Sequence, residues 1–322
     1  MSPGALLRQT ILAAVLAGAA SAVAAESTLT IGTGSRAGVY FQAGRAICRL
    51  LNAAEGASGP TCEAAETAGS IDNLRNVRAG RLQFAIAQSD WQYHAVNGSD
   101  RFTGDKADPD LRALFSLHGE AFMLVARRDA NIRHLNDLAG KRVNIGNPGS
   151  GQRGTMEIVM RAMGWERSTF TLAEELPASQ QSMALCHDRV QAMIYIVGIP
   201  NDSVAQAVRL CDAIIVEVSG PPIDNLMAKQ PFYVPMNVSG GLYAGNPHDV
   251  PTFGVTATLV SSAKVGADTV YALTRTVFEN LERLRGMHPA FHQLNPQRMI
   301  ADGLTAPLHE GARRYYRERG WL

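Results

Sequence analysis

The chain has few charged residues and no excess of either sign. Its 322 residues include 30 Lys and Arg against 29 Asp and Glu, a formal net charge of +1 at pH 7. This near neutrality gives no electrostatic reason to expect nucleic acid or an anionic membrane surface as a partner. Apolar residues make up 46% of the sequence, which excludes wholesale disorder and predicts a packed core. The length fits about two domains of ~150 residues.

The common catalytic and metal-binding motifs are also absent. The sequence contains no H-E-x-x-H motif and no G-x-S-x-G motif. Residues 186–188 (Cys-His-Asp) are adjacent in the chain, so their side chains diverge and do not form a catalytic relay by themselves. His288 and His292 have helical spacing, but Pro289 between them favours the start of a helix over a metal site. We therefore expect a protein that is not an enzyme and uses no cofactor or metal.

Long apolar runs are missing as well, and the run near the N-terminus is too short to span a membrane. Arg8 precedes an apolar stretch at residues 11–20, and a small-residue A-x-A motif follows at residues 22–24. A membrane span needs ~18–20 apolar residues, whereas this order of segments is typical of a secretory signal peptide. We predict a signal peptide over residues 1–24 and a soluble, periplasmic protein. Its mature chain carries 29 charged residues of each sign, because Arg8 is the one charge removed.

Export changes the meaning of the four cysteines. Neither sequence-local pair has CxxC spacing or a partner histidine at a zinc-ligand interval. In an oxidising compartment two disulfides are the favoured interpretation, with buried free thiols as the alternative. Three connectivities are possible, and we favour the local one, which pairs Cys48 with Cys62 and Cys186 with Cys211.

Strand-like and helix-like segments alternate along the chain. The alternation predicts an α/β fold with parallel sheets covered by helices. Residues 220–251 are rich in Pro, Gly and Asn and are expected to form long ordered loops. Apolar runs typical of strands occur at residues 29–31, 84–87, 121–126, 142–145, 192–197, 213–218 and 255–260, and helical patterns occur at residues 40–52, 71–78, 155–163 and 267–285.

Two glycine-rich turns precede predicted helices, at residues 32–38 and 149–155. Backbone N–H groups at such helix starts bind anions, helped by the positive end of the helix dipole. The alternative is that these glycines only allow tight turns. The turn at residues 149–154 also matches the dinucleotide fingerprint G-x-G-x-x-G, so an exported nucleotide-binding enzyme is the alternative function.

Further polar residues lie at turns and after predicted strands. Ser70 is a good N-cap for the predicted helix 71–78. Gln88, Asp90 and Asn201 each follow a predicted strand. Open α/β sheets bind ligands at the carboxyl ends of their strands, so we expect these side chains to face a solute.

These turns carry a family resemblance. The sequence resembles the TAXI family of TRAP-transporter solute receptors. The matching stretches occur in the same order over residues 29–322, which is nearly the whole mature chain. The matching stretches are residues 31–35 (IGTGS), 38–40 (GVY), 66–70 (ETAGS) with Asn73, 88–90 (QSD), 137–142 (DLAGKR), 146–151 (GNPGSG), 240–243 (GGLY) and 250–255 (VPTFGV).

The resemblance implies a fold, a function and partners. The fold would be that of a type II periplasmic binding protein, in which two lobes, each a β-sheet flanked by helices, enclose a ligand cleft. Lobe I would hold residues 25–120 and 256–322, and lobe II residues 121–255, with a hinge near residues 120–125 and 255–260. A monomeric receptor would capture a small organic anion, either a carboxylate or an amino acid such as glutamate or 2-oxoglutarate. It would deliver this solute to TRAP membrane permease subunits that are driven by an ion gradient.

Twelve candidate ligand contacts follow from the turns and the resemblance together. Tyr40 offers a hydroxyl to a carboxylate or packs in the core. Arg153 forms a bidentate carboxylate pair or lies on a solvated helix face, and Asp90 receives a ligand amino group or caps a helix. The full set is Thr33, Ser35, Tyr40, Thr67, Ser70, Asn73, Gln88, Asp90, Ser150, Gly151, Arg153 and Asn201.

Overall fold

The computed structural model describes residues 28–55 and 61–322. The predicted signal peptide, residues 1–24, lies outside these described residues. Within them, no helix combines the length and the apolar character needed to cross a bilayer.

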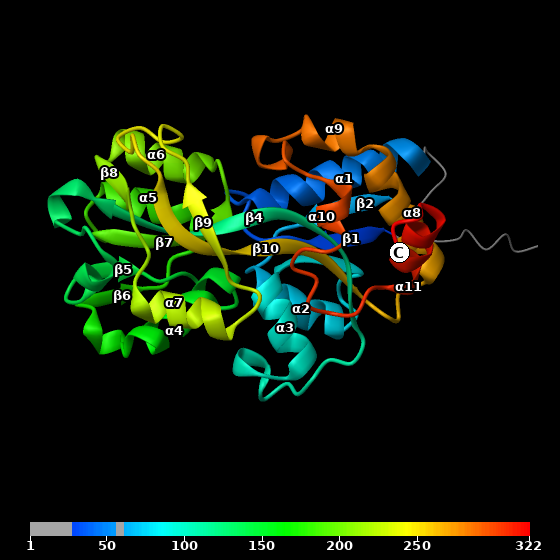
Figure 1. Ribbon diagram of the computed structural model, residues 1–322, viewed down its shortest axis with the longest axis horizontal. Helices are drawn as coiled ribbons and strands as arrows, with labels where there is room; N and C mark the ends of the chain where they lie inside the picture. Colours follow the sequence, from blue (N-terminus) through cyan, green and yellow to red (C-terminus); the bar gives the residue numbers. More distant parts are fainter. Residues whose placement is uncertain (1–27, 56–60) are drawn as a thin grey trace, which may run out of the picture.

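A mixed sheet of ten strands runs through the described part of the chain (Figure 1). Its strands follow the order β2-β1-β3-β10-β4-β7-β5-β6, while β8 pairs with β4 and β9 pairs with β10. The bounds are β1 Leu29–Gly32, β2 Cys62–Ala65, β3 Phe84–Gln88, β4 Leu111–Arg127, β5 Arg142–Asn144, β6 Leu172–Glu174, β7 Ala192–Gly198, β8 Ala213–Val216, β9 Val234–Val238 and β10 Val250–Ser262.

Helices cover both faces of this sheet, which makes the α/β class predicted from the sequence correct (Figure 1). A short 3₁₀ helix, η2, follows α3 at Asp100–Phe102. The α-helices are α1 Val39–Glu55, α2 Ser70–Arg78, α3 Ser89–Asn97, α4 Gly151–Met163, α5 Ala178–Cys186, α6 Asp202–Leu210, α7 Pro221–Lys229, α8 Ala267–Glu279, α9 Leu281–Arg285, α10 Pro296–Met299 and α11 Glu310–Glu318.

The elements gather into two lobes (Figure 1). The first lobe contains β1 to β3 with α1 to α3 and α8 to α11, and the second contains β5 to β9 with α4 to α7. Strands β4 and β10 belong to both lobes. They pair antiparallel with each other. Strand β10 also pairs with β3 of the first lobe and β9 of the second, and β4 also pairs with β7 and β8 of the second lobe. The chain therefore crosses between the lobes in two long, paired strands.

Buried apolar side chains fix the helices against the sheet. Ile47 of α1 and Phe115 of β4 belong to one cluster, and Val159 of α4 and Ile223 of α7 belong to another. Trp91 of α3 is fully buried in a third cluster. Burial of side chains of this size stabilises the fold by roughly 1.5–3 kcal/mol each. This packing sets where each helix begins relative to the strand before it.

The prediction of long loops at residues 220–251 is correct only for residues 239–249, which form neither helix nor strand. Residues 220–251 also contain α7, which begins at Pro221, and strand β9, which pairs with β10. The sequence is misleading because proline usually ends regular structure, whereas in the first turn of a helix its missing N–H costs no hydrogen bond.

Other elements differ in extent or direction from the prediction. The expected helix 267–285 is two helices that meet at Asn280, and α4 begins at Gly151, four residues earlier than expected. The sheet is mixed, since β4 and β10 run antiparallel to their neighbours. The predicted strand 121–126 is only the end of β4, which begins ten residues earlier at Leu111, and the predicted strand 255–260 lies within β10, which begins at Val250. The other predicted strands and helices are confirmed with small shifts of their ends.

The disulfide prediction is confirmed in its local connectivity. Cys48 of α1 bonds to Cys62 of β2, and Cys186 at the end of α5 bonds to Cys211 just after α6. Each bond ties together elements of one lobe.

Candidate functional site

The carboxyl ends of parallel strands from both lobes meet at one cavity. In the first lobe β1 and β2 lead into α1 and α2, and in the second lobe β5 and β6 lead into α4 and α5. A cavity of about 200 Å³ lies among these helix starts. The four starts line it with Gly38 and Val39 of α1, Gly69 and Ser70 of α2, Ser150 and Gly151 of α4, and Pro177 and Ala178 of α5.

This convergence makes the cavity electrostatically favourable for an anion. The first N–H groups of a helix have no partner within it, and each helix start carries the positive end of a dipole. One such end stabilises a nearby negative charge by about 0.3–1 kcal/mol, and four of them surround this cavity. A carboxylate is the kind of group that such a site binds.

Charged side chains do not add to this attraction for an anion. Among the described residues that line the cavity there is no Lys or Arg, and the acids are Glu66 and Glu120. Glu66 is half exposed and pairs with Arg36 at 3.0 Å. The attraction for an anion therefore has to come from the helix starts and from neutral donors such as Ser35 and Asn147.

The wall between α2, β3 and α4 is tightly packed. The Ser70 hydroxyl accepts a 3.2 Å hydrogen bond from the Gln88 N–H, and Gln88 is only 3% exposed. The Gln88 Oε1 atom has no hydrogen-bond partner among the described residues. A Cβ at Gly151 would lie 1.9 Å from that oxygen, so glycine is required there for close approach. An unpaired buried acceptor in a cavity wall is ready to receive a ligand donor.

Tyr40 and Glu120 form a second part of the wall. The Tyr40 hydroxyl of α1 donates a 2.6 Å hydrogen bond to Glu120 Oε2 of β4. Both residues are buried, and burial raises the pKa of Glu120 to about 8 although the hydrogen bond from Tyr40 opposes the shift. Glu120 sits where β4 changes partners, opposite Val255 of β10 and Gly198 of β7.

The structure brings seven of the twelve predicted contacts to the cavity. These are Ser35, Tyr40, Thr67, Ser70, Gln88, Ser150 and Gly151. The prediction that Ser70 caps α2 is wrong, because Gly69 occupies the N-cap and Ser70 is the first helical residue. Gly69 has a φ of 121°, a value that side chains disfavour, which is why the cap is a glycine.

Thr33 and Asn73 lie behind the cavity wall. The Thr33 hydroxyl donates to the carbonyl oxygen of Ala65 at 2.6 Å. The Asn73 amide donates to the carbonyl oxygens of Thr33 and Ile86, at 2.6 and 2.8 Å. These contacts hold the turn after β1 against β2 and β3, so both side chains support the site and do not border it.

Asp90 is also kept away from the cavity. It is fully buried, and the Tyr233 hydroxyl of the second lobe donates to it at 3.1 Å. Burial raises the pKa of Asp90 to about 7. A ligand amino group bound in the cavity described above would not meet this carboxyl group.

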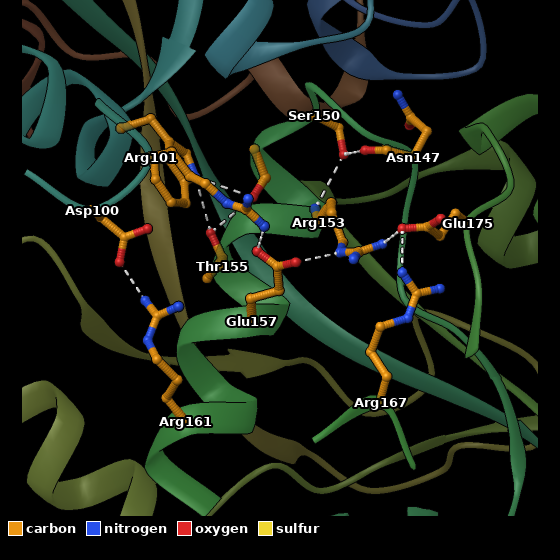
Figure 2. A network of polar contacts seen from close by, with 12 residues as sticks. Asp100, Arg101, Asn147, Ser150, Arg153, Thr155, Glu157, Arg161, Arg167 and Glu175 are labelled. Carbon is orange, nitrogen blue, oxygen red and sulfur yellow. Dashed lines mark hydrogen bonds and ion pairs between the residues drawn. The ribbon is translucent and has the colours of Figure 1, made fainter. Parts of the chain in front are cut away.

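Arg153 does not line the cavity and lies in an ion-pair network (Figure 2). Its Nε lies 2.9 Å from Glu157 of α4, its Nη1 pairs with Glu175, and Arg167 reaches Glu175 at 3.1 Å. Glu157 also pairs with Arg101 of the first lobe. The structure therefore gives no support for Arg153 as a ligand contact.

Asn201 and the turn before α4 join the two lobes. The Asn201 amide donates to the carbonyl oxygen of Ala37 at 3.1 Å, while its Oδ1 caps α6. Asn147 donates to the carbonyl oxygen of Ala68 at 3.1 Å, and the Asp72 N–H donates to the carbonyl oxygen of Gly149 at 3.1 Å. The glycine-rich turn at 149–154 is thus covered by the first lobe.

Several residues that line the cavity are not among the twelve predicted from the sequence. Glu120 is the most important, and it could have been noticed as a lone acid within the apolar run 111–126, because buried strands rarely hold unpaired carboxyl groups. Gln152, Ser179 and Tyr195 also line the cavity and carry no local signal.

Comparison with known proteins gives a family match and distant structural likenesses. A model of the NMT1-like family matches residues 31–320. A Xanthomonas citri protein determined with ATP bound shares 12% identity and a TM-score of 0.50, covering 92% of this chain and 99% of that one. The alkanesulfonate-binding protein SsuA from Xanthomonas axonopodis pv. citri shares 16% identity and a TM-score of 0.47, with coverage of 82% and 74%. An ancestral arginine-binding protein shares 14% identity and a TM-score of 0.49, with coverage of 82% and 98%.

These identities bear on the fold alone. The architecture, with two helix-flanked lobes and a cavity between them, is the one that the sequence predicted through its resemblance to type II periplasmic binding proteins.

Proposed function

Since this chain belongs to the NMT1-like family, we propose that it is an extracytoplasmic solute receptor. Its solute is a small organic anion, either a carboxylate or an amino acid such as glutamate or 2-oxoglutarate. The observation that carries this proposal is the meeting of four helix starts, two from each lobe, around one small cavity. Capture requires such donors, and no catalytic step is needed to explain them.

The size of the cavity supports a small solute. Pockets for drug-sized ligands measure roughly 300–1,000 Å³, whereas this cavity measures about 200 Å³. A dinucleotide would not fit, and the start of the glycine-rich turn packs against α2, where the Asp72 N–H donates to the carbonyl oxygen of Gly149. Both observations count against the nucleotide-binding alternative.

The finer parts of the proposal rest on the resemblance to TAXI receptors. In that arrangement residues 1–24 direct export, and lobes of residues 25–120 with 256–322 and of residues 121–255 close on the solute. The loaded receptor then docks on a TRAP-type permease. Strands β4 and β10, which cross between the lobes, support a hinge at this place because a twist in two strands moves the lobes without breaking either.

Thermal unfolding of the mature protein tests the proposal. The chain should be stabilised by a small carboxylate or amino acid, since a ligand of the folded state at 100 times its Kd adds about 2.7 kcal/mol. A panel of glutamate, 2-oxoglutarate, other short acids, NAD and ATP separates the two functions. Stabilisation by NAD or ATP with no response to any small acid would contradict the receptor.

A further inference from the structure

The cavity contains a buried carboxyl group with no cation to neutralise it. Glu120 is 2% exposed and borders the cavity. Its one hydrogen-bond donor among the described residues is the neutral hydroxyl of Tyr40. Removing an ionised carboxylate from water without a cationic partner is strongly unfavourable. The ionised form of Glu120 is therefore costly at this position unless a positive group arrives from outside.

The groups that face Glu120 from the surrounding elements do not supply that charge. Tyr40 comes from α1 and Tyr195 from β7, and both are neutral. Asp90 of α3 adds negative charge nearby. His118, two residues before Glu120 on β4, has its pKa lowered to about 3 by burial and is uncharged.

The rest of the cavity favours a ligand with a negative group and a hydrogen-bond donor. Four helix starts favour a negative group. Gln88 Oε1, an unpaired and buried acceptor beside α4, favours a hydrogen-bond donor. A plain dicarboxylate would satisfy the helix starts but would place its second charge against Glu120 or force that group to stay protonated. A zwitterion can place its negative group at the helix starts and its positive group at Glu120.

We propose that Glu120 is the specificity-determining residue of this cavity and that it binds the ammonium group of an amino acid whose carboxylate lies at the helix starts. The proposal rests on the proposed receptor function, because it assumes that this cavity holds a solute. It assigns to Glu120 the role that the sequence suggested for Asp90, which the structure keeps out of the cavity.

Matched pairs of ligands that differ at one group provide the test. Each amino acid is compared with its 2-oxo acid, for example glutamate with 2-oxoglutarate and alanine with pyruvate, by isothermal titration calorimetry on the mature protein. We expect the preferred amino acid to bind at least tenfold more tightly than its oxo acid. In Glu120→Gln this preference should fall to less than threefold, whereas in Glu63→Gln, an exposed acid of β2, it should be unchanged.

A pH series supplies a second, independent readout. Because the pKa of Glu120 is about 8, an ammonium that stabilises the ionised form should release a proton on binding. Affinity for the amino acid should then rise by up to about tenfold per unit between pH 6 and pH 7.5. This pH dependence of affinity should vanish in Glu120→Gln. The variant therefore distinguishes titration of Glu120 from titration of Asp90.

The outcomes distinguish the role of Glu120 from the receptor function. Oxo acids that bind as tightly as amino acids, or a preference that survives in Glu120→Gln, would overturn the role of Glu120 and leave the receptor function standing. Binding of a solute without an amino group and no response to any amino acid would do the same. A protein that binds no member of the panel would contradict the proposed function itself.

Discussion

The indole N–H of Trp91 donates a 3.0 Å hydrogen bond to the carbonyl oxygen of Gly151. A side chain of the first lobe thereby holds the first turn of α4, which belongs to the second lobe. Gly154 lies against the same indole, and a Cβ at that position would be 2.2 Å from a ring carbon. The lobes are therefore in direct contact at a helix start that borders the cavity.

Gly151→Ala should impair solute binding. The added methyl group would meet Gln88 Oε1 at 1.9 Å and the Ser70 hydroxyl oxygen at 2.8 Å, so the wall must shift or the lobes must part. We expect affinity to fall at least tenfold, measured by calorimetry. Gly104→Ala is the control, because that exposed position has no heavy atom within 4 Å of the new Cβ. Equal affinities for the two variants would show that the close approach at Gly151 does not matter.

Asp90→Asn should reduce the pH dependence of stability. Burial raises the pKa of Asp90 from 3.8 to about 7, so the unfolded chain loses its proton first. The free energy of unfolding should therefore fall as pH rises from about 4 to 7 and level off above, by about 4 kcal/mol at most from this group.

Urea unfolding at pH 4.5 and 7.5 measures this contribution. The fall in unfolding free energy between the two pH values should be smaller in Asp90→Asn than in the wild type. The exposed Asp224→Asn should behave as the wild type does. An unchanged fall in Asp90→Asn would mean that Asp90 does not titrate in this range.

Arg153→Ala should destabilise the protein without weakening solute binding. The Arg153 side chain is 9% exposed and pairs with Glu157 and Glu175 (Figure 2). The substitution would remove this cationic partner from both carboxylates. We expect a loss of about 1–3 kcal/mol in unfolding free energy and a Kd within twofold of the wild type. Arg167→Ala, which removes an exposed partner of Glu175, should cost less than about 1 kcal/mol. A large loss of affinity in Arg153→Ala would restore it as a ligand contact.

The two disulfides should each stabilise the fold by about 3 kcal/mol, because loops of 14 and 25 residues lose comparable entropy when closed. Replacing Cys48 and Cys62 by serine, or Cys186 and Cys211 by serine, should lower the urea midpoint without changing the secondary structure. The wild type treated with reductant should lose more than either variant. A loss below about 1 kcal/mol in both variants would argue against this entropic contribution.

Asn201→Asp should favour separation of the lobes. The substitution keeps the oxygen that caps α6 but replaces the amide that donates to Ala37 of the first lobe. We expect Kd to rise about 5- to 30-fold, the equivalent of 1–2 kcal/mol for one part-buried hydrogen bond. X-ray scattering should show a more extended protein at half-saturating solute. The control is Asn97→Asp, whose side chain is exposed. Identical scattering and affinity in the two variants would contradict this role.

Local patterns predicted the parts of the site that are built locally. Ser35 lies in a turn between a strand and a helix, and Ser70 and Gly151 are the first residues of the helices that follow such turns, so the local chain determines where they point. The pairing of Cys48 with Cys62 follows from short separation in the same way.

The errors arose where distant parts of the chain decide the outcome. Glu157 lies one helical turn from Arg153, so this ion pair can be predicted from the sequence. Glu175 reaches Arg153 only because β6 packs beside β5. Glu120 enters the cavity because β4 bridges the lobes there, and that bridging depends on its pairing with β7 and β10, which lie far along the chain. Asp90 follows the correct strand but turns away into the contact between lobes.

The crossing of β4 and β10 also bears on how the protein can be divided. Gly119 and Thr256 face each other in the antiparallel register, so the chain leaves the first lobe and returns to it at neighbouring positions. In topological terms the second lobe is an insertion in a loop of the first. A short hairpin joining Gly119 to Thr256 would close the first lobe on itself, since antiparallel partners can be linked by two residues. The first lobe could then be produced alone, with its two helix starts open to solvent.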